Sequence, residues 1–511
     1  MSERLDAQSG GPGVGTAAPV LQSELKRGAI GLTGATMQAI THIAPAIAAL
    51  FFTQFIVSLA GITAPLAYLI GVLVVLMLGN TLVQLSKHLP SAGGYYTYVS
   101  RALHPRAGFL TSWMYVLYSP LSGGPIYGFF GFILEGELKA NYHVDLPWLW
   151  WVFVLVGAPF TAFLQHRGIE LTARALLILG SCEIAIVLAL AISGFASPGP
   201  GGFSFSVFNF NNKLALSGFT LAIVLAVQGL TGWEAAAPLA EETRDPKRNV
   251  PRSVILSIVI LGAFLVFTFW GVITGFGVDT VNKLINSPDL PGLALARRLW
   301  GGAWWLIIAA FFTSTLAVCL ATANVGTRMW YGMGRSGSFP RWFAKVHPTY
   351  KTPSSAILVQ MCLALGSGLI GGFVFKPDVS FFLIDGLILV LGVAFVYVIA
   401  NFAVIRYYAT ERRTEFNPLL HLVFPLFSTG VLLYAIALSF QPFCSTICPG
   451  SPYKWAPVVD GVWLLLGVLV LMYMRASGRE NWIRNAGAAF GESEADLEAA
   501  VARRDRPGVA T

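Results

Sequence analysis

Charged residues are scarce in this chain of 511 residues, in which Asp, Glu, Lys and Arg together make up 11%. A soluble domain carries about 25%. Hydrophobic residues reach 55%, and the mean hydropathy is +0.68. The shortage of charge excludes an ordinary soluble globular protein. Because only helices and closed barrels cross a bilayer, and long apolar runs favour helices, we expect an all-α polytopic membrane protein.

Residues that hold metals or perform covalent chemistry are also few. The chain has five cysteines and seven scattered histidines, without metal-ligand or catalytic spacing. We therefore expect no metal, no cofactor and no enzymatic activity. Cys444 and Cys448 share a predicted outside loop, and both a small disulfide and a free pair stay open for them.

Twelve apolar segments are long enough to cross the membrane, with ends uncertain by several residues. They are residues 30–58, 64–87, 107–138, 147–165, 171–195, 216–241, 252–276, 302–331, 354–375, 379–407, 418–440 and 456–475. With the N-terminus inside, 26 of the 33 lysines and arginines fall in inside segments. Positive loops stay on the cytoplasmic side, so both termini are predicted to be cytoplasmic. The net charge of +8 follows from this topology and predicts no nucleic-acid partner.

The polar, Gly/Pro/Ser-rich residues 1–24 are expected to be a disordered tail without a secretory signal. From Ser477 onward the chain is charged and Ala-rich, and both a short helix and disorder stay open.

Two predicted spans are interrupted at matching places. The first reads TMQAITHIAPAIAALFF, with His42 and Pro45 in mid-span, and the sixth reads AVQGLTGWEAAAP. They open two successive sets of five spans, and such paired breaks indicate a binding site at the membrane midplane. Freed N–H groups suit a carboxylate and freed carbonyls suit an ammonium, so an amino acid matches both. A plain Pro or Gly kink is the alternative.

Three segments carry a family resemblance. LPSAGGYYTYVSRALHPRAGFLTSW (89–113), AEETRDPKRNVPRS (240–253) and ANVGTRMWYGMGRSGSFPRWFAKVHPTYKTP (323–353) resemble the amino acid–polyamine–organocation (APC) transporter family, in order and spacing. The resemblance implies a leucine-transporter-type fold of five plus five inverted helices with discontinuous first and sixth spans. It also implies a small-molecule substrate, an amino acid or an amine.

The division expected from this resemblance has four parts. They are the tail 1–27, the inverted-repeat core 28–410, the last two spans 411–476 and the tail 477–511. The expected function is secondary active transport of amino acids across the plasma membrane, proton-coupled or by exchange. An amine or polyamine carrier is the alternative, and a ligand sensor or a membrane enzyme has less support.

The resemblance also implies which residues at the two breaks belong to the binding site. The family's Gly-aromatic-acid pattern falls on Gly232, Trp233 and Glu234, which makes 228–233 the expected unwound stretch, with Gln228 in place of an aromatic lid. The first span is expected to bend near Ala44–Ile47. The predicted substrate-binding residues are Ala44, Pro45, Ala46, Ile47, Tyr118, Ser119, Gln228, Gly229, Thr231, Gly232, Trp233 and Thr322.

Four ionisable residues in the spans are functional candidates, because burying them is costly. Glu183 stands where many similar transporters carry a lysine, and we hypothesise that it couples protons or balances a cationic substrate. A neutral glutamate bonded to a carbonyl is the alternative. Glu234 is expected to brace the unwound backbone. Asp385 suits an outer gate or a wetted surface, and His42 a titrating group or a buried neutral side chain.

Two further expectations follow from charged and hydroxyl residues. A sodium site is disfavoured, because Ala317 and Val318 stand where such a site needs hydroxyl groups in the eighth span. Glu241 and Glu242 are expected either to lie in a solvated loop or to form ion pairs that close the cytoplasmic side. The nearby cations are Arg244, Lys247, Arg248 and Arg252.

Overall fold

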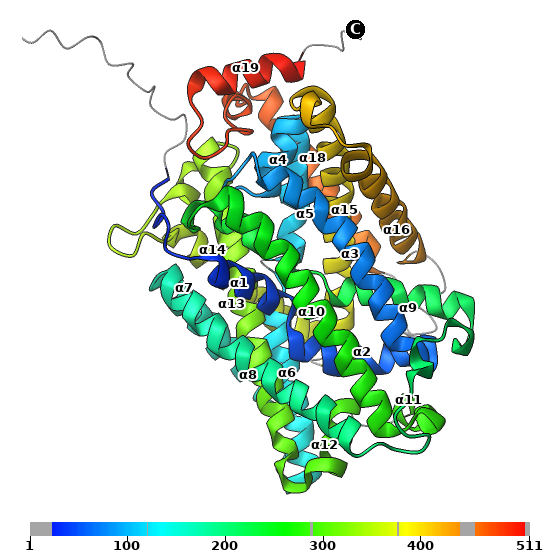
Figure 1. Cartoon of the computed structure of the whole chain (residues 1–511). Coiled ribbons are helices and arrows are strands. Elements are labelled where there is room, and N and C mark those ends of the chain that lie inside the picture. The colour runs from blue at the N-terminus through cyan, green and yellow to red at the C-terminus, as the bar shows by residue number, and fades with distance from the viewer. Residues whose placement is uncertain (1–22, 120, 287–289, 376–377, 440–454, 506–511) are drawn as a thin grey trace, which may run out of the picture.

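The computed structural model of this protein is a bundle of long helices (Figure 1) and describes residues 23–119, 121–286, 290–375, 378–439 and 455–505. Within these ranges there is no β-strand, and Ile30 and Thr243 form one isolated parallel bridge. The all-helical fold expected from the sequence is confirmed. Cys444 and Cys448 lie outside the described residues.

The longer helices follow the apolar segments closely. In chain order they are α1 (Leu32–Ile43), α2 (Pro45–Ala60), α3 (Ala64–Ser86), α4 (Tyr95–Ala102), α5 (Pro105–Tyr118), α6 (Gly123–Tyr142), α7 (Leu149–His166), α8 (Ile169–Ala196), α9 (Leu216–Gly229), α10 (Pro246–Phe276), α11 (Val281–Ile285), α12 (Pro291–Trp300), α13 (Trp305–Ser336), α14 (Ser354–Phe375), α15 (Val379–Thr410), α16 (Phe424–Ser439), α18 (Ala456–Ala476) and α19 (Glu494–Asp505). Short 3-10 or π turns join them. They are η1 (Gly61–Thr63), η2 (Phe205–Phe208), η3 (Phe210–Asn212), η4 (Trp233–Glu242), η5 (Val278–Thr280), η6 (Gly301–Trp304), η7 (Arg341–Ala344), η8 (Arg413–Glu415), η9 (Leu419–Val423) and η11 (Asn481–Ile483).

Ten stretches of the described chain are long and apolar enough to cross a membrane. One of them, Leu32–Ser86, contains both predicted spans 30–58 and 64–87. The predicted span 107–138 is not among the ten: it is divided between α5, which has 14 residues, and α6, whose second half carries Glu135, Glu137 and Lys139. A multi-pass membrane protein is therefore supported, while the count of twelve spans and the inverted repeat stay predictions.

The first span breaks at Ala44, whose left-handed backbone (φ 59°) separates α1 from α2. Pro45 opens α2, and proline has no N–H to give to the carbonyl of Thr41. The amide of Ala44 bonds to that carbonyl instead and closes the last turn of α1. The bend expected near Ala44–Ile47 thus begins at the first of these residues.

The sixth span breaks over Leu230–Gly232, between α9 and η4. The amides of Leu230 and Thr231 bond back to the carbonyls of Val227 and Gln228, so the last turn of α9 holds longer than the sequence suggested. The stretch 228–233 predicted to be unwound is therefore too long at its start. Beyond Gly232, whose φ is 128°, the chain continues as the 3-10 helix η4 rather than as an α-helix.

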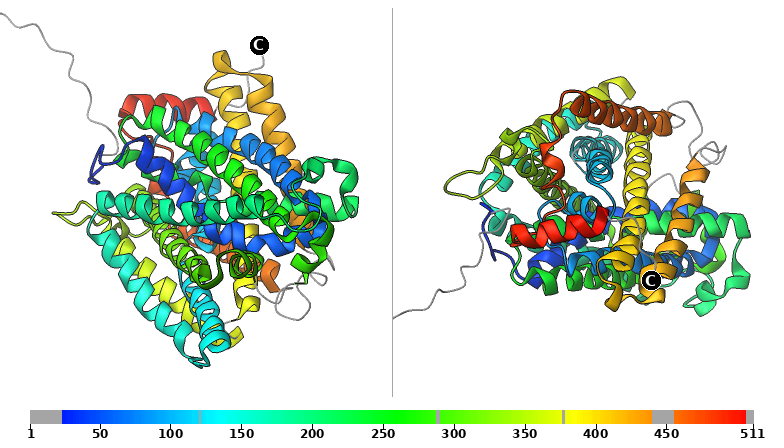
Figure 2. Two further views of the ribbon diagram at one scale, coloured as in Figure 1. Left: turned by 60° about the horizontal axis from the view of Figure 1, so that its bottom comes forward. Right: turned by 90° about the horizontal axis from the view of Figure 1, so that it is seen from above.

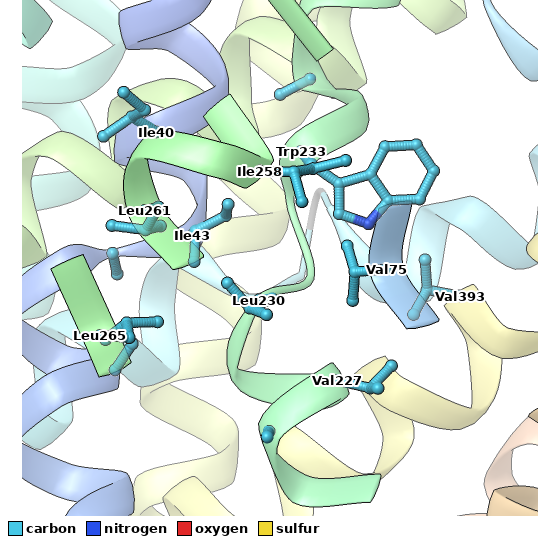
Figure 3. Packing of buried hydrophobic residues seen from close by; sticks show 14 of the residues in the cluster. Ile40, Ile43, Val75, Val227, Leu230, Trp233, Ile258, Leu261, Leu265 and Val393 are labelled. Atoms are coloured by element: carbon cyan, nitrogen blue, oxygen red, sulfur yellow. The ribbon is translucent and has the colours of Figure 1, made fainter. Parts of the chain in front are cut away.

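The two breaks lie directly against each other. A Cβ atom added to Gly232 would stand 2.9 Å from the main-chain carbon of His42 and 2.9 Å from the amide nitrogen of Ile43. Figure 3 shows the packing around this contact: Trp233 points toward Val75 and Val393, on the opposite side of the η4 backbone from Ile43. Only a glycine lets the two interrupted helices approach this closely.

Shorter elements lie at the two ends of the bundle (Figures 1 and 2). α11 and α12 pack against α2 at one end, while α4 and α19 contact each other at the other end. We refer to this second end, with residues 28–31, α4, the end of η4 and η7, as the α4 face. Residues 478–505 lie on this face and include α19, so the short helix left open by the sequence is present.

Candidate functional site

A cavity of about 190 Å³ lies at the two breaks. Its walls come from the α1–α2 and α9–η4 junctions and from α5, α6, α13 and α15. Among the described residues, its lining is His42, Ile43, Ala44, Ile47, Phe51, Phe52, Phe55, Tyr118, Ser122, Ile126, Leu225, Gln228, Thr231, Val318, Thr322, Phe382, Gly386, Leu387, Leu389 and Val390. None of these described lining residues is an aspartate, glutamate, lysine or arginine.

Of the four residues predicted at the first break, Ala44 and Ile47 line the cavity, whereas Pro45 and Ala46 are buried beside it. The first two N–H groups of α2 have no helical partner, and each is bonded to a side chain of another helix. Ala46 N–H donates to Glu183 Oε2 at 2.9 Å, and Ile47 N–H donates to Ser314 Oγ at 3.4 Å. Glu183 of α8 therefore caps the start of α2 and does not itself line the cavity.

At the second break, Gln228 and Thr231 line the cavity, but three other predicted residues do not. Gly229 and Gly232 give close approach instead: a Cβ atom on Gly229 would stand 2.6 Å from the Tyr68 hydroxyl. Trp233 is buried in the core, with its ring 5.1 Å from that of Tyr397. The structure therefore gives these three residues a role in shaping the break.

Glu234 braces the second break from within. Its Oε2 accepts hydrogen bonds from the Gly232 N–H at 3.2 Å and from the Tyr397 hydroxyl at 2.7 Å. Its Oε1 accepts from the Tyr115 hydroxyl at 3.0 Å. This geometry matches the bracing expected from the sequence, because the carboxyl group satisfies an amide that the break leaves without a helical partner.

The polar part of the cavity wall gathers near the end of α1. His42 and Tyr118 both line it, with their rings stacked at 5.4 Å. His42 is 4% exposed, and neither ring nitrogen has a hydrogen-bond partner among the described residues. Thr322 also lines the cavity, whereas Ser119 bonds to the Thr322 carbonyl at 2.6 Å and lies behind the wall.

Asp385 lies away from this cavity. It is buried, and it lines a separate cavity of about 310 Å³ between α5, α6, α14, α15 and the start of α18. Because Asp385 is buried, it does not lie on the wetted surface that the sequence left open as one alternative. Its neighbours Gly386 and Leu387 line the central cavity, but Asp385 does not.

The ion pairs on the α4 face differ from those expected. Glu242 pairs with Arg328 through two hydrogen bonds (2.8 and 3.2 Å), and Glu241 pairs with Arg335; all four side chains are buried or nearly so. The four cations proposed as partners from the sequence follow η4 in the chain, whereas η4 itself packs against α13, where Arg328 and Arg335 stand. One of those four, Arg244, bonds to the Gly28 carbonyl instead.

Sequence reasoning missed the aromatic wall of the cavity. Phe51, Phe52 and Phe55 of α2 and Phe382 of α15 line it, and the Phe51 and Phe382 rings stand 5.1 Å apart, edge to face. The run FFTQF directly after the first break was the available signal. Its apolar side chains, however, also fit contact with lipid, so the sequence alone does not assign them.

The described residues contain no group of three or more His, Cys, Asp or Glu side chains placed to hold a metal ion. Where a sodium site would need hydroxyl groups in α13, Ala317 is packed against Leu176 of α8 and Val318 faces the cavity. The disfavoured sodium site stays a prediction.

The sequence is similar to those of known transporters. The low-affinity putrescine importer PlaP of Escherichia coli (strain K12) is 28% identical over 327 residues, which cover 62% of this chain and 69% of the importer. The serine/threonine exchanger SteT of Bacillus subtilis (strain 168) is 24% identical, over 62% of this chain and 71% of the exchanger. The polyamine transporter RMV1 of Arabidopsis thaliana is 24% identical, over 53% of each.

The family assignment rests on most of the sequence. The model of the family described as "Amino acid permease" matches residues 34–485, which include both breaks, every wall of the cavity and the ion pairs of the α4 face. With relatives that are permeases and exchangers rather than enzymes, this multi-pass membrane protein belongs to the amino acid permease family of the APC superfamily.

Proposed function

We propose that this protein is a secondary active transporter that carries an amino acid or a closely related amine across the plasma membrane by alternating access. The observation that carries the proposal is the meeting of the two interrupted helices at a cavity that both of them line, with Gly232 against His42 and Ile43. Backbone that leaves its helix at membrane depth is tolerated where it lines such a cavity.

The buried pairs of the α4 face support the gating part of this proposal. Glu242–Arg328 and Glu241–Arg335 tie η4 to α13, and the bridge between Ile30 and Thr243 ties the start of α1 to the end of η4. Opening this face requires these contacts to separate. In the proposed orientation both termini, and therefore the α4 face, lie in the cytoplasm, with twelve spans of which the first ten form the inverted repeat.

We further propose proton coupling, with exchange as the alternative, and Glu183 as the coupling group. Its Oε1 has no hydrogen-bond partner among the described residues, while its Oε2 holds the first free amide of α2. A carboxyl group that takes up a proton becomes a weaker acceptor for that amide, so protonation would act directly on the break.

Accumulation in sealed vesicles tests the function. Vesicles that contain the purified protein should concentrate labelled substrate above the level in protein-free vesicles, and an imposed proton gradient should increase that accumulation. A ligand that binds the protein without entering the vesicles would indicate a sensor instead. Glu183→Gln should flatten the pH dependence of uptake, whereas Glu170→Gln, an exposed acid paired with Lys26 at the start of the same helix, should leave it unchanged.

A further inference from the structure

A cavity lined by basic residues lies at the α4 face, between the end of α7 and the start of α8. Its volume is about 320 Å³, and it shares no lining residue with the central cavity. The N-terminal segment and the chain between η7 and α14 complete its wall. The described lining residues include one acid, Glu170, and four cations, Lys26, Arg167, Arg174 and Lys351. The basic cavity therefore carries a net positive charge.

The acid of this cavity balances one of its cations. Glu170 pairs with Lys26 at 2.8 Å. Arg167 lies over two aromatic rings, with its guanidinium carbon 4.8 and 5.8 Å from their centroids, and this contact holds the group in place without adding a negative charge. Arg174 and Lys351 form no ion pair within the described part of the chain. Three positive groups therefore line the cavity without a paired carboxylate.

A neighbouring cavity of about 280 Å³ adjoins the basic cavity, since Glu170 and Arg174 line both. The start of α1 contributes to the wall of this neighbour, through Ile30 and Gly31 among other residues. Arg174 is thus reached from two hollows, which together leave room for a group larger than a simple ion.

An exposed apolar row leads away from these cavities along α8. Leu171 lines the basic cavity and is 41% exposed, and Ile178, two turns further along the helix, is 63% exposed. Residues three, four and seven apart lie on one face of a helix, so Leu171, Arg174 and Ile178 form a single row. Because α8 is long and apolar enough to cross a membrane, this row runs from the cations into the hydrocarbon region.

The chemistry of this place favours an anion that carries a hydrocarbon chain. Arginine and lysine bind phosphate oxygens through charge-assisted hydrogen bonds, and basic pockets at the ends of membrane helices bind phospholipid head groups. A free phosphate would contact the cations but leave the exposed row of α8 without a partner. A zwitterionic lipid would contact the row but bring its own cation to a positive cavity.

We propose that the basic cavity binds the phosphate group of an anionic phospholipid, with one acyl chain along Leu171 and Ile178 of α8. The phosphate contacts Arg174 and Lys351, which form no ion pair of their own. This lipid site lies outside the transport path and goes beyond the proposed function, because it requires neither the central cavity nor the two breaks.

Thermal unfolding of the full-length protein in detergent tests the choice of ligand. Dioleoyl phosphatidylglycerol should raise the unfolding midpoint in a saturable way, whereas dioleoyl phosphatidylcholine, which has the same chains and no net charge, should raise it far less. Inorganic phosphate and glycerol 3-phosphate supply the anion without the chain and should leave the midpoint unchanged. Equal stabilisation by the two lipids, or stabilisation by a soluble phosphate as large as that by phosphatidylglycerol, would overturn the proposal.

Two double variants with the same change in charge test the location. Arg174→Gln with Lys351→Gln should weaken the Kd for phosphatidylglycerol at least about tenfold, because two cations of the cavity are removed. Lys247→Gln with Arg248→Gln removes two cations at the start of α10 that line neither cavity, and should change that Kd by less than about twofold.

All four substituted residues are exposed, so the midpoints of both double variants without lipid should match that of wild type. An equal loss of lipid affinity in the two variants would mean that general surface charge attracts the lipid, and would overturn the site.

Uptake by the same proteins separates this inference from the proposed function. Substrate accumulation by a protein that shows no preference for phosphatidylglycerol would reject the lipid site and keep the transporter. Binding of phosphatidylglycerol that depends on Arg174 and Lys351, in a protein that accumulates nothing, would keep the lipid site and reject transport.

Discussion

At the residue scale, Gly232 fixes the distance between the two interrupted spans. Its φ of 128° is rarely adopted by residues with a side chain, and a Cβ atom there would meet the main chain of His42 and Ile43 at 2.9 Å. Main chain cannot rotate away as the end of a flexible side chain can, so the conflict has to be resolved by moving one helix.

Gly232→Ala should therefore cost roughly 1–3 kcal/mol through backbone strain alone, and more through the clash. We expect a lower thermal midpoint in detergent and loss of most uptake. Gly366→Ala is the matched control, because that helical glycine has open space around the position of a Cβ atom. Equal behaviour of the two variants would contradict the contact between the breaks.

The hydroxyl of Tyr397 gives a second prediction at this scale. Tyr397→Phe removes the 2.7 Å hydrogen bond to Glu234 and should destabilise the protein by about 1.5–3 kcal/mol, since a buried acid loses a donor. Tyr98→Phe removes a buried hydroxyl that has no partner among the described residues and should be nearly neutral. Thermal unfolding of the two variants side by side measures the difference, and a neutral Tyr397→Phe would reject the bracing of the second break.

The residue scale also shows where sequence reasoning succeeds. A proline between two alanines marks the first break, and a glycine before an aromatic-acid pair marks the second, because both act on the backbone that carries them. The partner of a charged residue, by contrast, is not predicted by the residues next to it in the sequence. The capping of Ala46 by Glu183 and the pairing of Glu242 with Arg328 depend on how helices distant in sequence rotate toward each other, which a single sequence does not specify.

At the element scale, η4 ties the α4 face to α13. It carries Glu241 and Glu242 at its end, where they pair with α13, and Glu241 also accepts from the Ala92 N–H at 2.9 Å. The position of Trp233 follows from the same packing: the sequence places an aromatic residue at the break, but the orientation of η4 turns it into the core between Val75 and Val393 (Figure 3).

Removing one member of the Glu242–Arg328 pair tests the role of η4. Glu242→Gln leaves the guanidinium of Arg328, which is fully buried, without its counter-charge, and should cost about 3–5 kcal/mol. The double change Glu242→Leu with Arg328→Met should recover part of that loss. Glu415→Gln weakens the contacts of an exposed acid with Arg412 and His88 and should cost about 0–1 kcal/mol in the same thermal unfolding measurement. A loss as small for Glu242→Gln would show that the pair does not hold the face.

At the scale of the whole molecule, the C-terminal segment is bound to the α4 face. Arg101 of α4 bonds to Glu411 at the end of the α15 span and to Glu492 of the C-terminal segment. Burial alone would lower the pKa of Arg101, but these two carboxylates hold it above its usual value, so the link stays charged. The Phe490 amide bonds to the Pro90 carbonyl at 2.8 Å, next to the loop that contacts Glu241.

Arg101→Leu should weaken the attachment of the C-terminal segment to the α4 face. We expect faster protease cleavage after Ser477 in the otherwise intact protein, because two largely buried carboxylates lose a cationic partner. Arg484→Leu removes exposed pairs with Glu494 and Glu498 only and should change the cleavage rate little. Identical cleavage of wild type and Arg101→Leu would mean that the segment is held by other contacts.

The measurement that tests the account most directly is uptake into sealed vesicles, by wild type and Gly232→Ala, of a labelled amino acid or amine that stabilises the purified protein, with Gly366→Ala as control. The account predicts accumulation by wild type and by Gly366→Ala, and little or none by Gly232→Ala. Accumulation that is the same in all three would show that transport does not pass through the junction of the two broken helices. Binding of the labelled ligand by wild type without accumulation would show that the junction is a binding site and not a transport site.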